Sequence, residues 1–515
     1  MVFNILFDDK LFKPFYRLLL GKNLLSYSQD GRPFLDWTGA QVSTYRENRM
    51  MQSQWPEDVR RFSGQLKMNL GGVFSPKREI LIARAPARLD IMAGLSDYAG
   101  ATVLSTPLQA ATVVAVQKRL DRRFVIRNLD MNKERVINCE YRLDDLFEAG
   151  QLKPYSVLQG QFSQDPHHHW LSHVIGAIPV LLQEGFAKTW DSGANIAISS
   201  TIPMAAAVAS SAALQVANLL ALTAAFGLSL DGFQVALASQ ILENQIVGTP
   251  AGITHHVAVA LGQSNRTMVL RCQPHELVKM LSLPATLQWV GIASGVTLAH
   301  KESRFRDLRI ASFMGRKIIQ QNILSRSDSL DQIRYLCNID MGEWEKKYSK
   351  MVLAKILGKE FVKRYASHDD PATKINPEKR YAPRGAAEHH LLENKRSERL
   401  VHLLETANEE NLLEAGWLMY ESHQSYQERC GMGCKETDLL VNLIKAQGPE
   451  KGFYGAKSTG WGCGGTIVVL AARGTEDLLH NLASQYHDLT RYEPQLFFNS
   501  SLGAMEMGVI RVAFD

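Results

Sequence analysis

The chain has few cysteines for its length, and no pattern gives them a structural role. Its 515 residues include six cysteines, of which only Cys430 and Cys434 lie close together. Because no second pair follows at zinc-ligand spacing, the sequence predicts neither a zinc site nor a disulfide framework. We expect reduced thiols, as is usual in the cytoplasm.

A strong charge of one sign is also lacking. The formal net charge is +5, with 21% charged and 45% hydrophobic residues. No basic block with interleaved aromatic residues occurs, so we expect no nucleic-acid partner. The composition is that of an ordinary soluble globular protein, and the length allows two or three domains.

Long uninterrupted hydrophobic segments are absent as well. Asp8, Asp9 and Lys10 interrupt the apolar N-terminus and argue against a secretory signal. Residues 194–230 carry no charge, but Pro203 and several polar side chains break the run. We interpret it as a loop followed by a buried helix rather than a membrane span. The prediction is a cytoplasmic protein without membrane association, whose oligomeric state the sequence leaves undecided.

Short apolar runs alternate with helical periodicities from residue 79 onwards. Strands are expected in seven segments: 80–83, 111–118, 124–127, 195–199, 287–293, 467–470 and 507–512. Helices are expected at 170–184, after Ser210, and at 233–247. A short break before residue 287 suggests a change of domain near residue 285. The predicted units are an extension of unknown role (1–78), an N-terminal domain (79–285) and a C-terminal domain (286–515).

Three small-residue segments carry the chemistry. Residues 203–213 read Pro-Met-Ala-Ala-Ala-Val-Ala-Ser-Ser-Ala-Ala and open a helical pattern. Unpaired N–H groups and the positive dipole end of such a helix suit a phosphate. The other two segments are Arg84-Ala-Pro-Ala-Arg-Leu-Asp-Ile-Met-Ala-Gly-Leu-Ser-Asp-Tyr98 and Gly455-Ala-Lys-Ser-Thr-Gly-Trp-Gly-Cys-Gly-Gly-Thr466. Each motif is weak alone, and their combination in this order is much more specific.

Together the three segments resemble the motifs of the GHMP small-molecule kinases. Residues 79–515 resemble the sugar-1-kinase branch, which includes galactokinases and L-arabinokinases. Further similarity lies in four segments: 243–253, 369–373, 418–426 and 430–438. The resemblance implies an α+β fold of two domains with the active site in a cleft between them. The N-terminal domain would be ribosomal protein S5 domain 2-like with a left-handed crossover, and the C-terminal domain ferredoxin-like.

The resemblance also implies an activity: ATP- and Mg²⁺-dependent phosphorylation of the anomeric hydroxyl of L-arabinose or a galactose-like sugar. Positioning and charge neutralisation carry most of such a reaction. Arg88 would stabilise developing negative charge, and Asp97 would accept hydrogen bonds from the sugar. Gly460 and Gly462 would let the backbone approach the substrate.

The remaining roles concern the nucleotide and the metal ion. The resemblance places the phosphates on seven residues: Pro203, Ala205, Ala207, Ala209, Ser210, Ser211 and Ala212. Ser211 and Glu243 would coordinate Mg²⁺, which prefers hydroxyl, carboxylate and phosphate oxygens. A solvated Glu243 and a surface ion pair of Arg88 are the plainer alternatives.

The chain departs from the family at several of these positions. Alanines stand where the phosphate loop has three glycines, and a left-handed alanine costs about 1–2 kcal/mol. Alternatively, the loop relaxes to helical angles and the helix starts earlier. His255 stands at the aspartate of the catalytic base, and His256 at the following glutamine. Histidine can accept a proton near neutral pH, so His255 is the candidate base.

Two further departures concern the substrates. Gly94 and Leu95 replace the Glu-His of galactokinases, which favours a sugar other than galactose. Trp461 stands where a glycine is usual, which narrows the space at the third motif. Two other functions stay open at this point. One is a catalytically impaired protein that senses or binds a sugar or nucleotide. The other is a kinase for a different small metabolite, with a donor site altered for something other than ATP.

Overall fold

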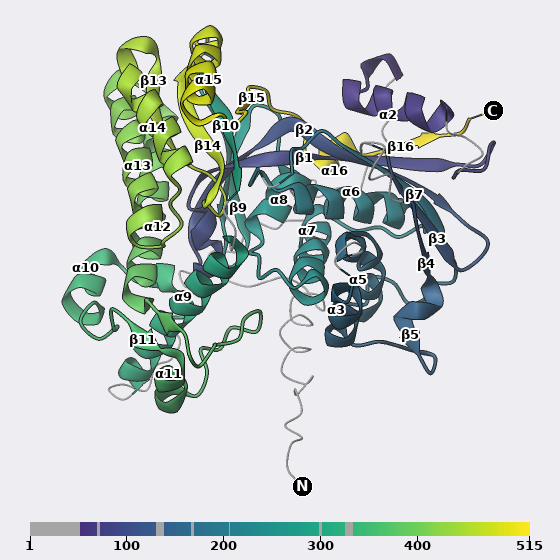
Figure 1. Ribbon diagram of the computed structural model, residues 1–515, viewed down its shortest axis with the longest axis horizontal. Coiled ribbons are helices and arrows are strands. Elements are labelled where there is room, and N and C mark those ends of the chain that lie inside the picture. Colours follow the sequence, from purple (N-terminus) through teal and green to yellow (C-terminus); the bar gives the residue numbers. More distant parts are fainter. Residues whose placement is uncertain are drawn as a thin grey trace, which may run out of the picture.

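The computed structural model describes residues 52–68, 73–129, 138–165, 169–204, 206–297, 301–324 and 333–514. In this part of the chain, two sheets with packed helices form the body of the molecule (Figure 1). Two short two-stranded sheets stand apart from them: β5 (Phe147–Glu148) with β6 (Gln151–Leu152), and β11 (Ile356–Leu357) with β12 (Arg380–Tyr381). Ala205, His167, His168 and most of the N-terminal extension lie outside the described residues.

The first sheet has eight strands, six of them in the order β16-β1-β2-β7-β3-β4, while β8 pairs with β2 and β9 with β8. Strand β1 (Ile80–Met92) is buried at every position, including its three charged residues Arg84, Arg88 and Asp90. The other strands are β2 (Thr102–Lys118), β3 (Arg123–Asn128), β4 (Asn138–Arg142), β7 (Ala194–Ser200), β8 (Arg266–Arg271), β9 (Glu276–Ser282) and β16 (Val509–Val512).

Helices cover both faces of this sheet, because successive side chains of a strand point to opposite sides. Ile80 and Ile82 of β1 pack with helix α2 (Glu57–Met68), whereas Leu81 and Ala83 face the large core. That core contains helix α6, and the other helices of this half are α3 (Tyr155–Ser163), α4 (Ser172–Ile175), α5 (Ala177–Gln183), α7 (Gly232–Ile241) and α8 (Thr254–Leu261). Residues 57–68 of the extension therefore act as a cover for the sheet.

Helix α6 (Ser210–Ala225) explains the charge-free stretch of the sequence. Its residues are apolar on nearly every side, and it packs against β1 and β2 in the large core. A helix of this composition is stable when surrounded by protein. The interpretation of this stretch as a loop and a buried helix is confirmed. In the described part of the chain, no helix has the length and apolar character needed to cross a membrane.

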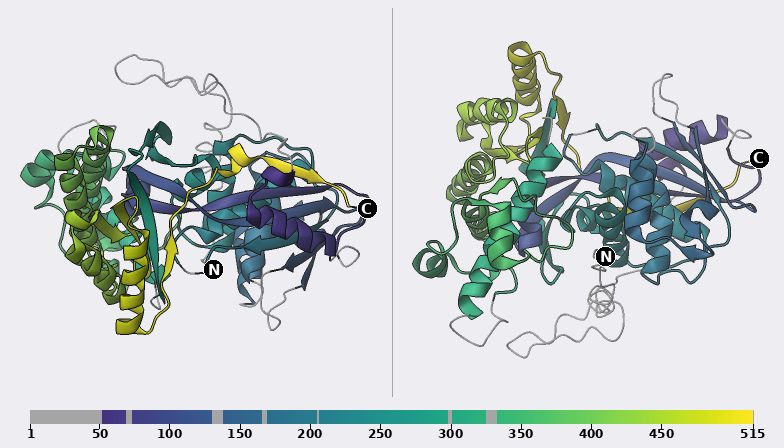
Figure 2. Two further views of the ribbon diagram at one scale, coloured as in Figure 1. Left: turned by 90° about the horizontal axis from the view of Figure 1, so that it is seen from above. Right: turned by 60° about the horizontal axis from the view of Figure 1, so that its bottom comes forward.

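The second sheet has four strands in the order β13-β14-β10-β15. They are β10 (Leu287–Thr297), β13 (Phe453–Ser458), β14 (Gly464–Ala472) and β15 (Gln495–Phe497). Helices gather at this end of the molecule, as both views of Figure 2 show. The longer ones are α9 (Lys301–Leu324), α11 (Gly358–Tyr365), α12 (Pro383–Thr406), α13 (Glu409–Glu428), α14 (Lys435–Gln447) and α15 (Glu476–Thr490), and α10 (Met341–Glu343) is a single turn. The short helix α16 (Ala504–Met507) instead packs against β1 of the first sheet and against α8.

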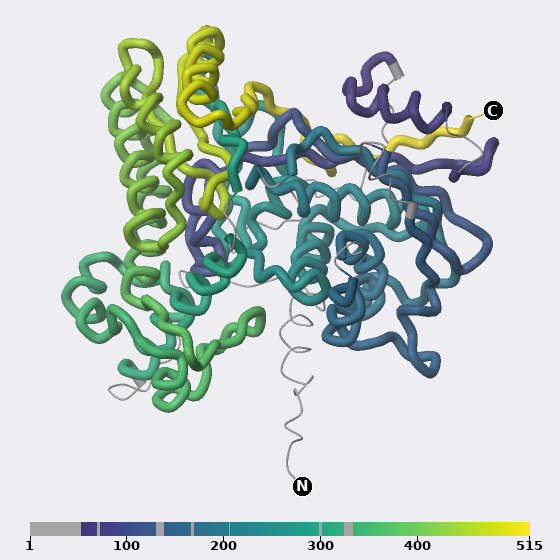
Figure 3. The backbone as a smooth tube through the Cα atoms, viewed as in Figure 1, coloured from purple at the N-terminus to yellow at the C-terminus, as the bar shows by residue number. Residues whose placement is uncertain are grey.

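The chain passes between the sheets twice. Strand β9 belongs to the first sheet and β10 to the second, so the change falls close to residue 285. After β15 the chain returns, and β16 pairs with β1 so that Val512 lies opposite Ile80. Figure 3 shows this C-terminal segment running back beside the start of β1. The division into residues 79–285 and 286–515 stays a prediction, and the last strand lies in the first sheet.

The strands and helices expected from periodicity are present. One detail was not anticipated: α7 ends at Ile241 and continues as a π-helical segment, η5 (Leu242–Val247). Such segments are rare and occur frequently at functional sites, because they alter the direction of one side chain. Here the segment contains Glu243.

The packing of α2 on the sheet is testable. Phe62 is fully buried between α2 and the first sheet, so Phe62→Ala should lower the free energy of unfolding by about 3–5 kcal/mol. Met68→Ala in the same helix is the control, because Met68 is 80% exposed. Chemical denaturation followed by circular dichroism measures both. Equal effects of the two variants would contradict the packing of α2.

Candidate active site

The alanine loop keeps the backbone conformation of a glycine loop. Ala207 and Ala209 have φ angles of 63° and 67°, both in the left-handed region. Helix α6 begins only at Ser210, directly after them. The alternative of an earlier helix start is therefore wrong, and the alanines bear a cost of about 1–2 kcal/mol each. The conformation persists because neighbouring segments hold it.

Hydrogen bonds attach this loop to both other motifs. The backbone N–H of Arg88, in β1, donates to the carbonyl oxygen of Val208 over 3.0 Å. The hydroxyl of Thr466, in β14, donates to the carbonyl oxygen of Ala206 over 2.6 Å. The loop thus lies between the two sheets, although the three segments are far apart in the sequence.

The first and third motifs are also bonded to each other. The N–H of Asp90 donates to the Thr459 hydroxyl over 2.8 Å, and this hydroxyl donates back to the Asp90 carbonyl over 2.8 Å. The Asp90 carboxylate accepts the N–H of Gly460 over 3.2 Å. Asp90 was not singled out from the sequence, although it lies within the quoted first motif. Its role is to join the two sheets at the site.

Glycines of the third motif are required by this close approach. Gly460 has a φ of 60°, and a Cβ there would lie 2.7 Å from the carbonyl oxygen of Ala207. A Cβ at Gly465 would lie 2.8 Å from the Cβ of Ala207. Trp461 stacks on Phe305 of α9 with ring centroids 4.2 Å apart. Whether Trp461 narrows a substrate site stays a prediction.

Arg88 is a buried cation, and two of its three guanidinium nitrogens lack a hydrogen-bond partner among the described residues. Its residue is 5% exposed, and Nε and Nη1 have no hydrogen bond to any described residue. Burial lowers the pKa of Arg88, against the opposing effects of Asp90, Tyr426 and Asp97. A surface ion pair is therefore excluded for Arg88. Because an unpaired buried charge is costly, these N–H groups indicate a place for an anion.

Glu243 is buried rather than solvated. It is 3% exposed, and its Oε1 accepts a hydrogen bond from Ser211 over 2.9 Å. Its Oε2 lies 2.8 Å from Nε2 of His256 and 3.7 Å from Nε2 of His255. Burial alone would raise the pKa of Glu243, but the two imidazoles hold it well below its usual range. Ser211 and Glu243 thus lie together, as the resemblance implies, with two imidazoles on the other oxygen.

His255 stands in the first turn of α8, next to this carboxylate. Burial, and then His256, lower the pKa of His255 to about 4 despite the opposing effect of Glu243. Arg88 lowers it further, as expected for a nearby cation. The imidazole is therefore neutral near pH 7.

Asp97 lies against the segment that precedes α8. Its carboxylate accepts the N–H of Tyr98 over 2.6 Å and that of Thr254 over 3.5 Å. Gly252 is required here, because a Cβ at this position would overlap the Asp97 carboxylate. Burial raises the pKa of Asp97, and Arg309 opposes that effect. Its contact with a sugar stays a prediction.

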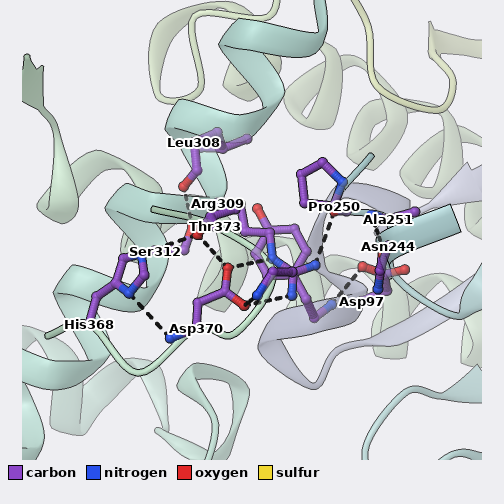
Figure 4. A network of polar contacts seen from close by, with 12 residues as sticks. Asp97, Asn244, Pro250, Ala251, Leu308, Arg309, Ser312, His368, Asp370 and Thr373 are labelled. Atoms are coloured by element: carbon purple, nitrogen blue, oxygen red, sulfur yellow. Dashed lines mark hydrogen bonds and ion pairs between the residues drawn. The ribbon is translucent and has the colours of Figure 1, made fainter. Parts of the chain in front are cut away.

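A buried ion pair next to Asp97 was missed. Arg309 of α9 donates Nε and Nη2 to Asp370 over 2.8 and 2.9 Å, and Nη1 to the carbonyl oxygen of Pro250 (Figure 4). Thr373 and His368 complete the surroundings of Asp370. The segment 369–373 was quoted as similar to the family, but nothing in the sequence pairs it with one arginine among many.

Comparison with known proteins agrees with this geometry. Residues 172–263 match the family model described as GHMP kinases N terminal domain. The chain is 33% identical over 497 residues to "L-arabinokinase" of Arabidopsis thaliana, with 86% of this chain and 48% of that protein covered. It thus spans about half the length of this relative. It is 23% identical to "Galactokinase" of Fusobacterium nucleatum subsp. nucleatum, with 84% of this chain and 95% of that protein covered.

The fold has a counterpart among solved structures. Galactokinase of Lactococcus lactis, solved with galactose, superposes with a TM-score of 0.66 and 20% identity, covering 87% of this chain and 99% of that one. This likeness concerns the α+β fold of mixed sheets and helices. The chain belongs to the GHMP kinase family, and its similarity extends to the sugar-1-kinase branch of that family.

The strain in the loop gives a first prediction for the site. Ala209→Gly removes a left-handed alanine worth about 1–2 kcal/mol. It also adds freedom to the unfolded chain, worth about 0.4–1 kcal/mol. We expect a net stabilisation of about 0.5–1 kcal/mol in chemical denaturation.

Ala225→Gly, at the other end of α6, is the matched control for this variant. Ala225 is half-buried like Ala209 but helical, so its replacement should destabilise by about 0.5–1 kcal/mol. Equal losses of stability in the two variants would contradict the left-handed conformation of Ala209.

The contact between Gly252 and Asp97 gives a second prediction. Gly252→Ala forces the carboxylate or the loop to move, and overpacking of this kind costs about 1–3 kcal/mol. Gly160→Ala is the control: Gly160 is exposed in α3 with open space around it, and alanine there should stabilise by about 0.5–1 kcal/mol. Thermal unfolding measures both, and an unaffected Gly252→Ala would refute the contact.

Proposed function

We propose that this chain is an ATP- and Mg²⁺-dependent sugar kinase that phosphorylates the anomeric hydroxyl of L-arabinose or a galactose-like sugar. The observation that carries the proposal is the buried Arg88 beside the alanine loop, whose Nε and Nη1 have no partner in the described part of the chain. A transferring phosphoryl group would supply the negative charge that this guanidinium lacks. The similarity to an L-arabinokinase and to galactokinases supports the sugar as acceptor.

The start of α6 supports the nucleotide site. The N-cap residue Ala209 offers no side-chain hydrogen bond, and the first turn contains no acidic residue. The N–H groups of Ser210, Ser211 and Ala212 are thus left for an anion at the positive end of the helix dipole. Pro203 and the left-handed loop precede this turn, so the phosphates would lie between the loop and the helix.

Ser211 and Glu243 fit the magnesium ion that accompanies ATP in this family. Their hydroxyl and carboxylate lie 2.9 Å apart and are hard oxygen donors. When bound, Mg²⁺ neutralises phosphate charge. The chain itself holds the phosphates on the start of α6 and orients the transferring group with Arg88.

The acceptor sugar would lie between Arg88 and Asp97. Neutral His255 is the candidate acceptor of the proton from the sugar hydroxyl. Gly460 and Gly462 would let the backbone of the third motif approach the substrate. The site therefore combines parts from both sheets.

Phosphate transfer to the anomeric hydroxyl is tested with a panel of sugars. We expect ADP release with L-arabinose or D-galactose and a sugar 1-phosphate in the ³¹P NMR spectrum. The methyl glycoside of the same sugar, whose anomeric oxygen is blocked, should give none. Equal turnover of the glycoside would overturn the anomeric assignment. Absence of turnover with every sugar would leave a binding protein built on a kinase fold.

Arg88→Lys tests the residue that carries the proposal. Lysine keeps the charge but loses the fork of N–H donors, so kcat should fall by about 10²–10³-fold. Arg399→Lys is the control, because Arg399 is 51% exposed and pairs with Glu414 away from the site. Equal activity of the two variants would remove Arg88 from the mechanism.

A further inference from the structure

Three donor atoms of the site meet around one point. One ring nitrogen of His255, one ring nitrogen of His256 and a carboxylate oxygen of Glu243 all lie within 4.8 Å of one another. All three residues are buried, at 7%, 0% and 3% exposure. The carboxylate oxygen is 2.8 and 3.7 Å from the two nitrogens. Ligands at about 2.0–2.2 Å from a common ion have separations of this size.

The Glu243 carboxylate is not fully hydrogen-bonded by the described residues. Nε2 of His256 is close to Glu243 Oε2 and Nε2 of His255 lies farther away, but neither contact is a hydrogen bond, and Oε2 accepts none from the described residues. The His256 nitrogen lies 3.3 Å from the amide oxygen of Gln215, a long contact. A buried carboxylate oxygen without a hydrogen bond is unusual and costly. It indicates a place where a cation can bind beside this oxygen.

The donor set differs from that of a magnesium site. Mg²⁺ prefers oxygen ligands and binds imidazole poorly, whereas Mn²⁺, Co²⁺ and Zn²⁺ accept imidazole nitrogen together with carboxylate. Two histidines and one carboxylate on one side of an ion also leave positions open for other ligands. Ser211, bonded to the other oxygen of Glu243, lies on the side of the alanine loop.

We propose that Glu243, His255 and His256 form a binding site for a divalent transition-metal ion such as Mn²⁺, Co²⁺ or Zn²⁺. The site goes beyond the proposed function, because these residues bind the ion without nucleotide or sugar. Because Ser211 at the start of α6 is bonded to the same carboxylate, a phosphate bound there would lie near enough to complete the coordination of the ion.

This proposal changes the role of one residue. When Nε2 of His255 holds the ion, this nitrogen has no lone pair for a proton from the sugar. The phosphate oxygens then accept that proton, and His255 is a ligand rather than a base. The two roles exclude each other in the metal-bound state.

The test is a metal titration of the tag-free protein after treatment with a chelator. Co²⁺ is added without nucleotide and followed by its visible absorption, and Mn²⁺, Zn²⁺ and Mg²⁺ are compared by calorimetry. We expect one transition ion per chain, bound about tenfold or more tightly than Mg²⁺. Binding of Mg²⁺ as tightly as Co²⁺ and Mn²⁺, or no binding of Co²⁺, would overturn the proposal. Kinase activity plays no part in this measurement, so its failure is separate from failure of the proposed function.

Substitutions at His255 and Glu243 test whether these residues bind the ion. His255→Asp exchanges the nitrogen for oxygen and should weaken Co²⁺ binding about tenfold or more, while Mg²⁺ binding holds or improves. Glu243→Gln should weaken every ion. His402→Asn is the matched control, because the His402 side chain is 71% exposed, and it should leave the titration unchanged.

Folding of the variants is checked by circular dichroism. His256 is fully buried, so the decision does not depend on a His256 variant. Unchanged Co²⁺ binding in both His255→Asp and Glu243→Gln would place the ion elsewhere and contradict the site.

Discussion

The site depends on how the loop of residues 206–209 is held. β1 bonds it through Arg88 and Val208, and β14 bonds it through Thr466 and Ala206. These two attachments keep alanines in a backbone conformation that glycine adopts more easily. A helix can begin at Ser210 with free N–H groups only because the loop before it stays out of the helix. The glycines at 460 and 465 give it the room to do so.

A buried cation and a buried anion next to this loop determine which ligands the site can bind. Arg88 is a cation whose Nε and Nη1 find no partner among the residues that the structure describes. Glu243 is an anion whose low pKa depends on two imidazoles. Water is largely excluded from both, so each interacts strongly with whatever charge enters. A phosphate has the negative charge that Arg88 can bind, and a metal ion has the positive charge that Glu243 can bind. The Arg309–Asp370 pair beside Asp97 is already satisfied and stabilises the surrounding segments.

Much of the fold could be predicted from the sequence, because strand and helix periodicities are local. The buried helix after the alanine loop and the strands at 80–83 and 287–293 are examples. Two features could not be predicted. The return of residues 509–512 to β1 is a pairing across most of the chain, and the π-helical turn around Glu243 leaves no mark in the hydrophobic pattern. The resemblance implied that Arg88, Ser211, Glu243 and His255 belong to one site. Their hydrogen-bond and ion-pair partners could be learned only from the structure.

The central claim is that the alanine loop still presents a phosphate site at the start of α6. The most direct measurement is a calorimetric titration of the protein with ATP in the presence of Mg²⁺, with adenosine in parallel. The account predicts saturable ATP binding with a Kd between about 1 μM and 1 mM, and much weaker binding of adenosine, which lacks the phosphates. Absence of ATP binding, or adenosine binding as tight as that of ATP, would contradict it.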